Sequence, residues 1–503
     1  MIQRNVLASL LSAAIFIAII IFAIVTSLQA SRIEQEQLRA EQVSKFMIDL
    51  FQQADPSHSR GNEIKVREML DVGAKQIMSG LTNQPNMRAS LLKVMGDVYR
   101  GLGDYNEAKE LLREALALRI KTSGAKNKEV VEIERLIGDV LLKQGNLKEA
   151  EPAIERAVSL CKDIYPTNSV QMAEALQELA LLRRNQQKLN EAEGIYKNAL
   201  MILSALGPSA NPQTINTLSD LASLYIFKGD YAEAEKLLNR SMTLALATFG
   251  EDHPETAIQM QNLAVTYELE NKFSSAKPLF RDSLQRYEKI FGEEHPQTVA
   301  ALTNYGTFLR KSGELDEGER VLRHALSLQE KIPSNSSIDT AYIHHNLGAI
   351  LLAQHELNAA ETEFQSALSI YSSSLPQNHV YIGTSRLFLG YTLLEKNLFS
   401  SAVAEFEKAV PIIRDGMPDD NEFYALAEAG LGATLIAQHQ YIAGEALLLD
   451  NYKIVLKARG ANDPTVLELK KWIERSFKEQ NKADQSAKYF ASLSTNPDNA
   501  AKH

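Results

Sequence analysis

The sequence has little of the chemistry that enzymes and metal proteins concentrate. It contains one cysteine, Cys161, and one tryptophan among 503 residues. A single cysteine excludes an intramolecular disulfide and a cysteine metal cluster, so Cys161 is expected to be a packing residue. No P-loop, HExxH, GxSxG or GxGxxG string is present. We therefore expect no enzyme activity, no cofactor and no bound metal.

An excess of positive charge is also missing. The chain has 63 acidic and 53 basic residues, which gives a formal net charge of −10. Nucleic-acid binders normally carry a basic surface, so no nucleic-acid partner is expected. Proline is scarce at 15 residues, while alanine, leucine, glutamate and lysine are abundant. This composition favours helices.

Three histidines lie close together in the sequence: His344, His345 and His355. Neighbouring residues on a helix point about 100° apart, so His344 and His345 make a poor pair of metal ligands. We interpret all three as surface or groove histidines.

One long hydrophobic run stands near the N-terminus. No charged side chain lies between Arg4 and Arg32, and the residues from Val6 to Leu28 are almost wholly apolar. A helix of that length rises about 35 Å, enough to cross a bilayer core. The run predicts a membrane anchor within residues 1–30, with a cleaved signal peptide as the alternative. Basic residues flank both ends, so the positive-inside rule does not fix the orientation, although the short N-terminal flank favours export.

Small residues recur along the chain with a constant 42-residue period. The first set is Gly96, Gly138, Ala180, Ala222, Ala264, Gly306, Gly348, Gly390 and Gly432. A second set follows twelve residues later: Ala108, Ala150, Ala192, Ala234, Ala276, Gly318, Ala360, Ala402 and Gly444. A third set follows seven residues after that: Ala115, Ala157, Ala199, Ser241, Ser283, Ala325, Ala367 and Ala409, with Asn451 breaking the pattern. Small side chains let paired helices approach closely, so the spacing predicts stacked helical hairpins.

Turn residues mark the boundaries of these hairpins. Between the two helices stand Gly103, Gly145, Gln187, Gly229, Asn271, Gly313, His355, Asn397 and His439. Glycine and asparagine tolerate the positive φ that ends a helix, so the other three turns are expected to be less favourable. Between hairpins, a phenylalanine-to-threonine string that ends in His253, Pro254, Glu255 and Thr256 recurs one period later.

The strings FGEDHPETAIQMQNLAVTYE and FGEEHPQTVAALTNYGTFLRKSGELDEGERVLRHAL resemble the 42-residue, kinesin-light-chain-like class of tetratricopeptide repeats. The resemblance implies an all-α, right-handed α-solenoid of about nine hairpins over residues 84–460. It also implies a concave face that binds protein or peptide partners rather than small-molecule substrates.

The sequence also predicts structure for the segments before and after the repeats. Residues 31–83 are expected to form juxtamembrane helices and a cap, although residues 31–51 also suit a coiled coil and a homodimer. Residues 461–480 are expected to form a capping helix and residues 481–503 a flexible tail. The string AEQVSKFMIDLFQQADP resembles the juxtamembrane part of bacterial Ser/Thr kinase–tetratricopeptide membrane proteins, here without the kinase domain. That resemblance implies a single-pass protein of the bacterial inner membrane with a periplasmic or other extracytoplasmic array.

An asparagine ladder is the candidate binding site. Asn262, Asn304 and Asn346 each stand two residues before the first small residue of their repeat, a position we call the ladder slot. In the resembled class, this asparagine contacts the backbone of an extended peptide. Expected neighbours are Gln261, Thr303 and His345, and the groove aromatics are Phe227 and Tyr391. The ladder slot holds Leu136, Glu178 and Asp220 in earlier repeats. The alternative is that these amides only hold adjacent helices together.

The function we expect is a membrane-anchored scaffold that binds a protein or extended peptide in its concave groove. A structural role within an oligomeric membrane complex is a variant of this expectation. A signalling adaptor that faces the cytoplasm is the alternative, and an enzyme of unrecognised type is a third.

Overall fold

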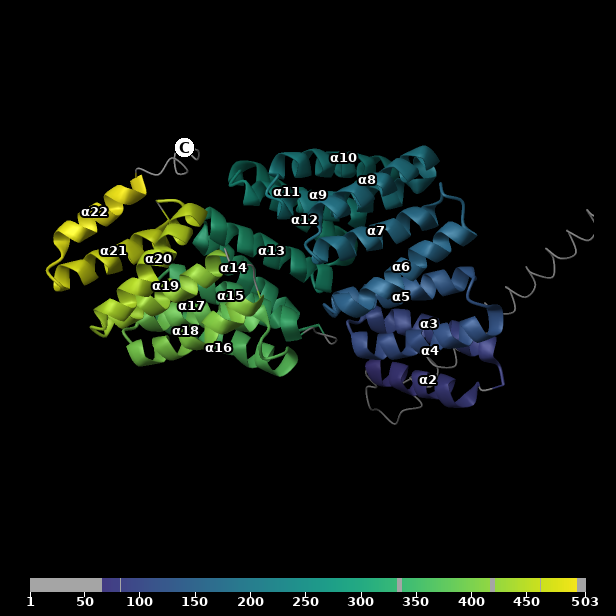
Figure 1. Ribbon diagram of the computed structural model, residues 1–503, viewed down its shortest axis with the longest axis horizontal. Helices are drawn as coiled ribbons and strands as arrows, with labels where there is room; N and C mark the ends of the chain where they lie inside the picture. Colours follow the sequence, from purple (N-terminus) through teal and green to yellow (C-terminus); the bar gives the residue numbers. More distant parts are fainter. Residues whose placement is uncertain (1–65, 82, 333–336, 417–420, 462, 495–503) are drawn as a thin grey trace, which may run out of the picture. The chain divides into compact units, whose positions relative to one another are not determined.

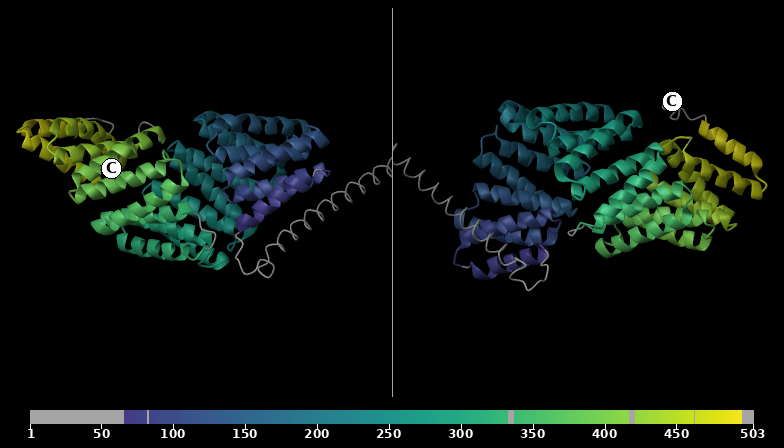
Figure 2. Two further views of the ribbon diagram at one scale, coloured as in Figure 1. Left: turned by 90° about the horizontal axis from the view of Figure 1, so that it is seen from below. Right: turned by 180° about the vertical axis from the view of Figure 1, so that it is seen from behind.

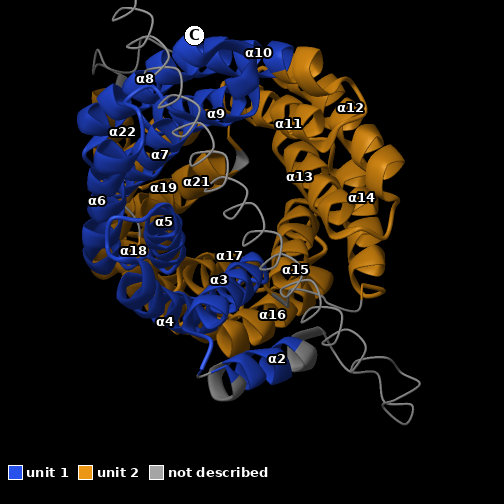
Figure 3. Cartoon of the chain, turned by 90° about the vertical axis from the view of Figure 1, so that its right-hand side faces the viewer, with its two compact units in different colours: residues 1–244 blue, residues 245–503 orange. Residues whose placement is uncertain are grey.

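The computed structural model describes residues 66–81, 83–332, 337–416, 421–461 and 463–494. Every regular element in this part of the chain is a helix (Figure 1). The chain divides into two compact units, residues 1–244 and residues 245–503 (Figure 3).

The helices follow one another with short connections. The first eight α-helices and one 3-10 turn are α2 (Val66–Gly80), α3 (Pro85–Gly101), α4 (Tyr105–Ser123), α5 (Lys128–Lys143), α6 (Leu147–Ile164), α7 (Val170–Asn185), α8 (Leu189–Leu206), η1 (Gly207–Ala210) and α9 (Asn211–Phe227). Helix α10 (Tyr231–Phe249) contains the boundary between the units. The remaining helices are α11 (Pro254–Leu269), α12 (Phe273–Phe291), α13 (Pro296–Ser312), α14 (Leu315–Gln329), α15 (Ser337–Ala353), α16 (Leu357–Ser374), α17 (Val380–Glu395), α18 (Phe399–Gly416), α19 (Glu422–Ala437), α20 (Tyr441–Arg459), α21 (Pro464–Glu479) and α22 (Ala483–Ser494).

Helices α3 to α20 pair as successive hairpins, from α3 with α4 to α19 with α20. Within each unit, the second helix of a hairpin packs on the first helix of the next, as α4 does on α5 and α16 on α17 (Figure 2). A single hairpin is too thin to bury its own apolar side, so stacking supplies the core. The structure confirms the predicted all-helical repeat array. The right-handed sense of the solenoid stays a prediction.

The first helices of the hairpins lie closer together than the second helices. In unit 2, α13 contacts α15, α15 contacts α17 and α17 contacts α19; in unit 1, α5 contacts both α3 and α7. Among the described residues, no comparable contact joins successive second helices. Figure 3 shows α11, α13, α15 and α17 along the inner side of the curve of unit 2. The first helices therefore line the concave face of each unit.

The recurring small residues lie where the two helices of a hairpin touch. A Cβ atom added to Gly138 would lie 2.5 Å from Cγ1 of Ile154 on the partner helix. A Cβ atom added to Gly306 would lie 2.6 Å from Cγ of Leu322. The small residues of all three sets are buried, as predicted. Asn451, which replaces the last of them, is buried too and donates a hydrogen bond to Glu428 at 2.9 Å.

The turn inside each hairpin uses the left-handed conformation. The nine residues predicted for this position all have φ between 58° and 84°, including Gln187, His355 and His439, whose φ values are 62°, 62° and 66°. Left-handed backbone costs an ordinary side chain about 1 kcal/mol more than it costs glycine. Three turns of the array therefore hold local strain.

Replacing Gln187 by glycine should stabilise the protein by about 0.5–1 kcal/mol, because glycine removes this strain. Gln187 is exposed, so the substitution removes no packing. The neighbouring change Gln186→Gly is the control, since Gln186 has an ordinary φ of −81° and should lose stability as glycine. Thermal unfolding followed by circular dichroism measures both. Equal shifts of the two variants would contradict the strain.

The motif between hairpins is a helix start built around histidine. The ring of His253 stacks on Phe249 with 4.4 Å between centroids. Its Nδ1 accepts a hydrogen bond from the backbone N–H of Glu255 at 3.1 Å, and so caps α11. The copy in the next hairpin repeats this, with His295 stacked on Phe291 at 4.3 Å. The motif thus marks where α11 and α13 begin.

The C-terminal part holds one more helix than expected. Residues 461–480 were predicted as a capping helix, and α21 lies there with Val466, Leu469, Ile473 and Phe477 buried. Within the predicted flexible tail, however, α22 packs back on α20 and α21. Its Tyr489 donates a hydrogen bond to the carbonyl of Leu449 at 2.8 Å, and Phe490 lies edge-on to Tyr452. These aromatic contacts explain why the segment is ordered.

The predicted membrane location is contradicted. Among the described residues, no helix is long and apolar enough to cross a membrane. These helices are amphipathic, because each one needs a polar side facing water as well as an apolar side facing its neighbours. The prediction of a single-pass inner-membrane protein with a periplasmic array is therefore corrected. The run from Val6 to Leu28, and residues 31–51 with their predicted homodimer, lie outside the described residues.

Candidate functional site

The predicted ladder lies on the first helices of three successive hairpins in unit 2. Asn262 is near the middle of α11, Asn304 of α13 and Asn346 of α15. Asn262 and Asn304 are partly exposed, whereas Asn346 is 3% exposed. Two of the three amides are therefore partly exposed on first helices, which line the concave face.

The three amides differ in their hydrogen bonds. Nδ2 of Asn346 donates to the carbonyl of Tyr342, one turn earlier in its own helix, at 2.9 Å. The side chains of Asn262 and Asn304 have no hydrogen bond to any part of the chain that the structure describes. An amide that held the stack together would be bonded to a neighbouring helix. The hydrogen bonds of Asn262 and Asn304 among the described residues therefore do not support the alternative that these amides hold adjacent helices together.

The three predicted neighbours of the ladder differ in burial and in hydrogen bonding. Nε2 of Gln261 is buried and has no partner among the described residues. The Thr303 hydroxyl donates to the carbonyl of Val299 in its own helix at 2.8 Å. Nδ1 of His345 lies 2.9 Å from Oγ of Ser385. Gln261 therefore has a free donor, while Thr303 and His345 are already bonded.

Two basic residues, Arg310 and Arg184, were not predicted as site residues. Arg310 on α13 is partly buried, and its Nε has no partner in the described structure. Burial lowers the pKa of Arg310, and repulsion by Arg459 lowers it further. Arg310 lies six residues after the ladder slot of its repeat, and Arg184 lies six residues after Glu178. The 42-residue register was the signal that could have identified this second position.

In two repeats of unit 1 the ladder slot carries a carboxylate. Burial raises the pKa of Glu178 to about 7, although Arg135 opposes the rise. Arg135 also bonds to it directly, with Nε 2.9 Å from Oε1 of Glu178. Burial raises the pKa of Asp220 to about 6, and Arg184 opposes this in the same way. Both carboxylates thus lie in surroundings where water is scarce.

The two predicted groove aromatics differ in exposure. Phe227, near the end of α9, is 51% exposed. Tyr391 on α17 is partly buried, and its hydroxyl donates to the carbonyl of Leu426 at 2.8 Å. Phe227 is therefore available for apolar contact, while the hydroxyl of Tyr391 already joins two neighbouring hairpins.

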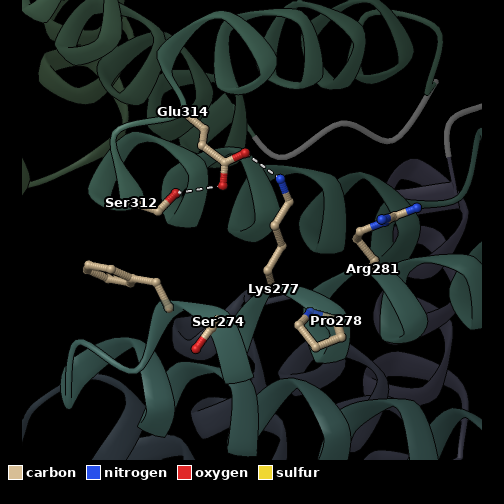
Figure 4. Close-up of a pocket in the computed structure, with 7 residues that line it drawn as sticks. Ser274, Lys277, Pro278, Arg281, Ser312 and Glu314 are labelled. Atoms are coloured by element: carbon tan, nitrogen blue, oxygen red, sulfur yellow. Dashed lines mark hydrogen bonds and ion pairs between the residues drawn. The ribbon is translucent and has the colours of Figure 1, made fainter.

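A pocket of about 330 Å³ lies away from the ladder, between α12 and the turn from α13 to α14. Figure 4 shows Lys277 reaching across it to Glu314, which also accepts a hydrogen bond from Ser312 at 3.4 Å. Lys277 also contacts Glu317 at 3.1 Å, so the ammonium group in the pocket is already paired with carboxylates. The pocket is formed by a second helix and a hairpin turn, so it does not belong to the concave face.

The remaining candidates for chemistry have ordinary partners. Cys161 is fully buried, and burial raises the pKa of its thiol. His344 on α15 contacts Glu363 on α16 at 2.5 Å, and His355, in the turn between these two helices, contacts Glu395 on α17 at 3.0 Å. Across the described ranges, no group of three or more histidine, cysteine or acidic side chains could hold a metal ion.

Three crystal structures are among those to which the chain is similar. BtubC from P. vanneervenii is 22% identical, with 45% of this chain and 90% of that chain covered and a TM-score of 0.40. A Rap protein complexed with competence and sporulation factor is 13% identical, with 73% and 97% covered and a TM-score of 0.49. Repeats of a protein from Podospora anserina described as a kinesin light chain are 18% identical, with 49% and 96% covered and a TM-score of 0.28.

No curated protein matches the chain significantly. None of the matches supports the expected resemblance to bacterial Ser/Thr kinase–tetratricopeptide membrane proteins. The family model described as tetratricopeptide repeat matches residues 87–163, 171–247, 213–289, 297–373 and 339–415, more than half of the sequence. The chain belongs to the tetratricopeptide repeat family.

Proposed function

We propose that the chain is an interaction scaffold that binds an extended peptide segment of a partner protein along the concave face of unit 2. The observation that carries this proposal is the state of Asn262 and Asn304. Both amides are partly exposed on first helices, and neither has a partner among the described residues. Because neither amide is committed to a neighbouring helix, both can exchange bound water for the backbone groups of a ligand.

The chemistry of the amide suits an extended backbone. An asparagine side chain both donates and accepts, so one residue can bond to the N–H and the C=O of a peptide group. An extended strand exposes its N–H and C=O groups along both edges. A side chain that can pair with these groups adds to the affinity for the strand, and one that cannot pair with them does not. Around Asn262, the same face of α11 carries Ile258, Val265 and Leu269, which are partly or largely exposed. They would supply apolar contact.

Replacing both Asn262 and Asn304 by alanine should weaken peptide binding about tenfold. Each lost hydrogen bond removes about 0.5–1.5 kcal/mol, and 1.4 kcal/mol corresponds to a factor of ten. The probe is the tightest binder of the full chain selected from a library of random dodecapeptides, synthesised with capped ends and a fluorescein label. Fluorescence anisotropy measures its affinity for each variant.

The matched control is Asn198→Ala, which removes an exposed amide from the second helix α8. It should leave the affinity unchanged. A double variant that binds the probe as well as the unaltered chain does would refute the proposed groove. A library that yields no binder at all would refute the scaffold function for linear peptides.

A further inference from the structure

Neighbouring first helices of unit 1 are joined by ion pairs at a fixed sequence spacing. Three such pairs are Lys93 with Glu132, Arg100 with Asp139 at 2.7 Å, and Arg135 with Glu174 at 2.7 Å. In each pair the second residue stands 39 positions after the first. The repeat geometry thus brings a long side chain on one first helix against the residue 39 positions later, on the next first helix.

Arg310 on α13 of unit 2 has the register position of Arg100 but lacks the matching partner. Both arginines lie four positions after the first small residue of their repeat. The residue 39 positions after Arg310 is Ala349 on α15, which is 7% exposed, and α13 and α15 are in contact. A methyl group accepts no hydrogen bond. The carboxylate that Asp139 supplies to Arg100 is therefore missing at Arg310.

The acidic residue in the same register on α11 does not replace that partner. This residue is Glu268, and its carboxylate is paired with Lys311. Among the described residues, the Arg310 side chain has no hydrogen bond or ion pair, and its Nε is buried. Burial also lowers the pKa of the guanidinium. Unit 2 thus holds a positive charge without a counter-charge, in surroundings that penalise an unpaired ion.

A peptide bonded to Asn304 could bring an acceptor to this charge. Asn304, Thr307 and Arg310 follow one another at three-residue steps on α13, so consecutive members are neighbours on the helix surface. All three are partly exposed. Six residues of helix rise about 9 Å, so Arg310 stands to one side of a backbone bonded at Asn304. This offset suits a side chain that projects from the strand, rather than the carboxylate that ends a chain.

We propose that Arg310 selects peptide ligands that carry an aspartate or glutamate side chain, whose carboxylate binds the guanidinium as Asp139 binds Arg100. The inference rests on the proposed function and adds a chemical requirement to its ligand. Guanidinium and carboxylate match in shape and can form two parallel hydrogen bonds. The chain as a whole is acidic, with a net charge of −10, so this preference has to come from a local charge.

The test uses the full chain and the same capped, labelled dodecapeptide, with each of its acidic residues replaced in turn by the corresponding amide. At one position the amide should weaken binding to the native chain about tenfold, as expected for a lost bond between charged groups. Arg310→Met should weaken binding of the unaltered peptide by the same factor. The two changes together should cost no more than either alone, because they remove one interaction.

A second measurement separates ligand binding from a structural role. Without ligand, Arg310→Met should melt at the same temperature as the native chain or higher, because methionine keeps the apolar stem and removes a charge that has no partner. Circular dichroism measures the melting. The matched control is Arg320→Met, which removes an exposed arginine from the second helix α14. It should change neither the affinity nor the melting temperature.

A tightest binder without an acidic residue would overturn the inference. So would losses from Arg310→Met and from the amide that multiply when combined, because the carboxylate would then bind elsewhere. A lower melting temperature of Arg310→Met would mean that the arginine holds the fold. Unchanged binding in Arg310→Met, with a loss in the Asn262 and Asn304 variant, overturns this inference alone. Unchanged binding in every variant overturns the proposed function with it.

Discussion

Replacing Gly444 by alanine is expected to destabilise the ninth hairpin by about 2–3 kcal/mol. A Cβ atom at this position would lie 2.6 Å from the carbonyl oxygen of Gly432 and 2.6 Å from Cγ1 of Ile436. The first of these atoms belongs to helix backbone and cannot rotate away. The hairpin must then separate α19 from α20, which opens the packing around it. This loss outweighs the gain of up to about 1 kcal/mol that alanine brings to a helix.

The other hairpins show why the effect is specific. In the sixth hairpin both small positions are also glycine, but a Cβ on Gly306 would meet the side chain of Leu322, and the carbonyl of Gly318 is 3.5 Å away. A side chain can move, so Gly306→Ala should cost less than Gly444→Ala. The distinction comes from backbone contact in one hairpin and side-chain contact in the other.

The matched control for Gly444→Ala is Gly194→Ala. Gly194 lies inside α8, and a Cβ there would meet nothing within 4 Å. This substitution should stabilise the chain by about 0.5–1 kcal/mol, because only the propensity gain remains. The single tryptophan, Trp472 on α21, packs next to α20 and reports unfolding of the ninth hairpin by fluorescence. A Gly444→Ala variant as stable as the native chain would contradict the close approach.

The repeat could be predicted because close packing and turn geometry restrict which residue types can occupy particular positions. Only small residues fit where α3 meets α4, and the same requirement returns with each hairpin. The nine predicted turn positions all have positive φ, even where glutamine or histidine stands. The hairpin of α21 and α22 was not predicted because the recurring small residues stop before it. One repeat length after Gly432 stands Glu474. The turn register does continue, since Asn481 has φ of 56° between α21 and α22.

The candidate site could be predicted only to the level of the helix face. Spacing placed Asn262, Asn304 and Asn346 in one register, and the structure has them on three first helices. Spacing could not show that Asn346 turns to the carbonyl of Tyr342 in its own helix, because that choice depends on local competition for hydrogen bonds. The unpaired Nε of Arg310 was equally hidden, since it depends on which partners from other helices come close enough.

Acidification is expected to destabilise unit 2 through His345. Burial, together with the nearby positive charge of Arg310, lowers the pKa of His345 from its ordinary value of 6.5 to about 3. The ring also meets Phe364 and Phe388 edge-on, at 5.7 Å and 5.5 Å between centroids. A proton there would bring a second positive charge into apolar surroundings. The folded state therefore keeps His345 neutral.

The sign and range of the effect follow from the shift. Below pH 6.5 the unfolded chain takes up a proton at this residue and the folded chain does not, so unfolding becomes more favourable as the pH falls. The loss grows by at most about 1.4 kcal/mol per pH unit and ends near pH 3, where the folded state also protonates. Between pH 6.5 and pH 4.5 this single group should remove about 2–3 kcal/mol from the free energy of unfolding.

The measurement is urea unfolding at several pH values, followed by circular dichroism, for the native chain and for His345→Asn. Asparagine keeps a polar group toward Ser385 but does not titrate, so the variant should start less stable and lose less on acidification. The control is His324→Asn, which removes an exposed histidine from the second helix α14 and should leave the slope unchanged. Carboxylates also weaken the fold at low pH, but they do so equally in all three proteins. The difference in slope between the two variants therefore belongs to His345, and parallel slopes would mean that its ring takes up protons in the folded chain as freely as in water.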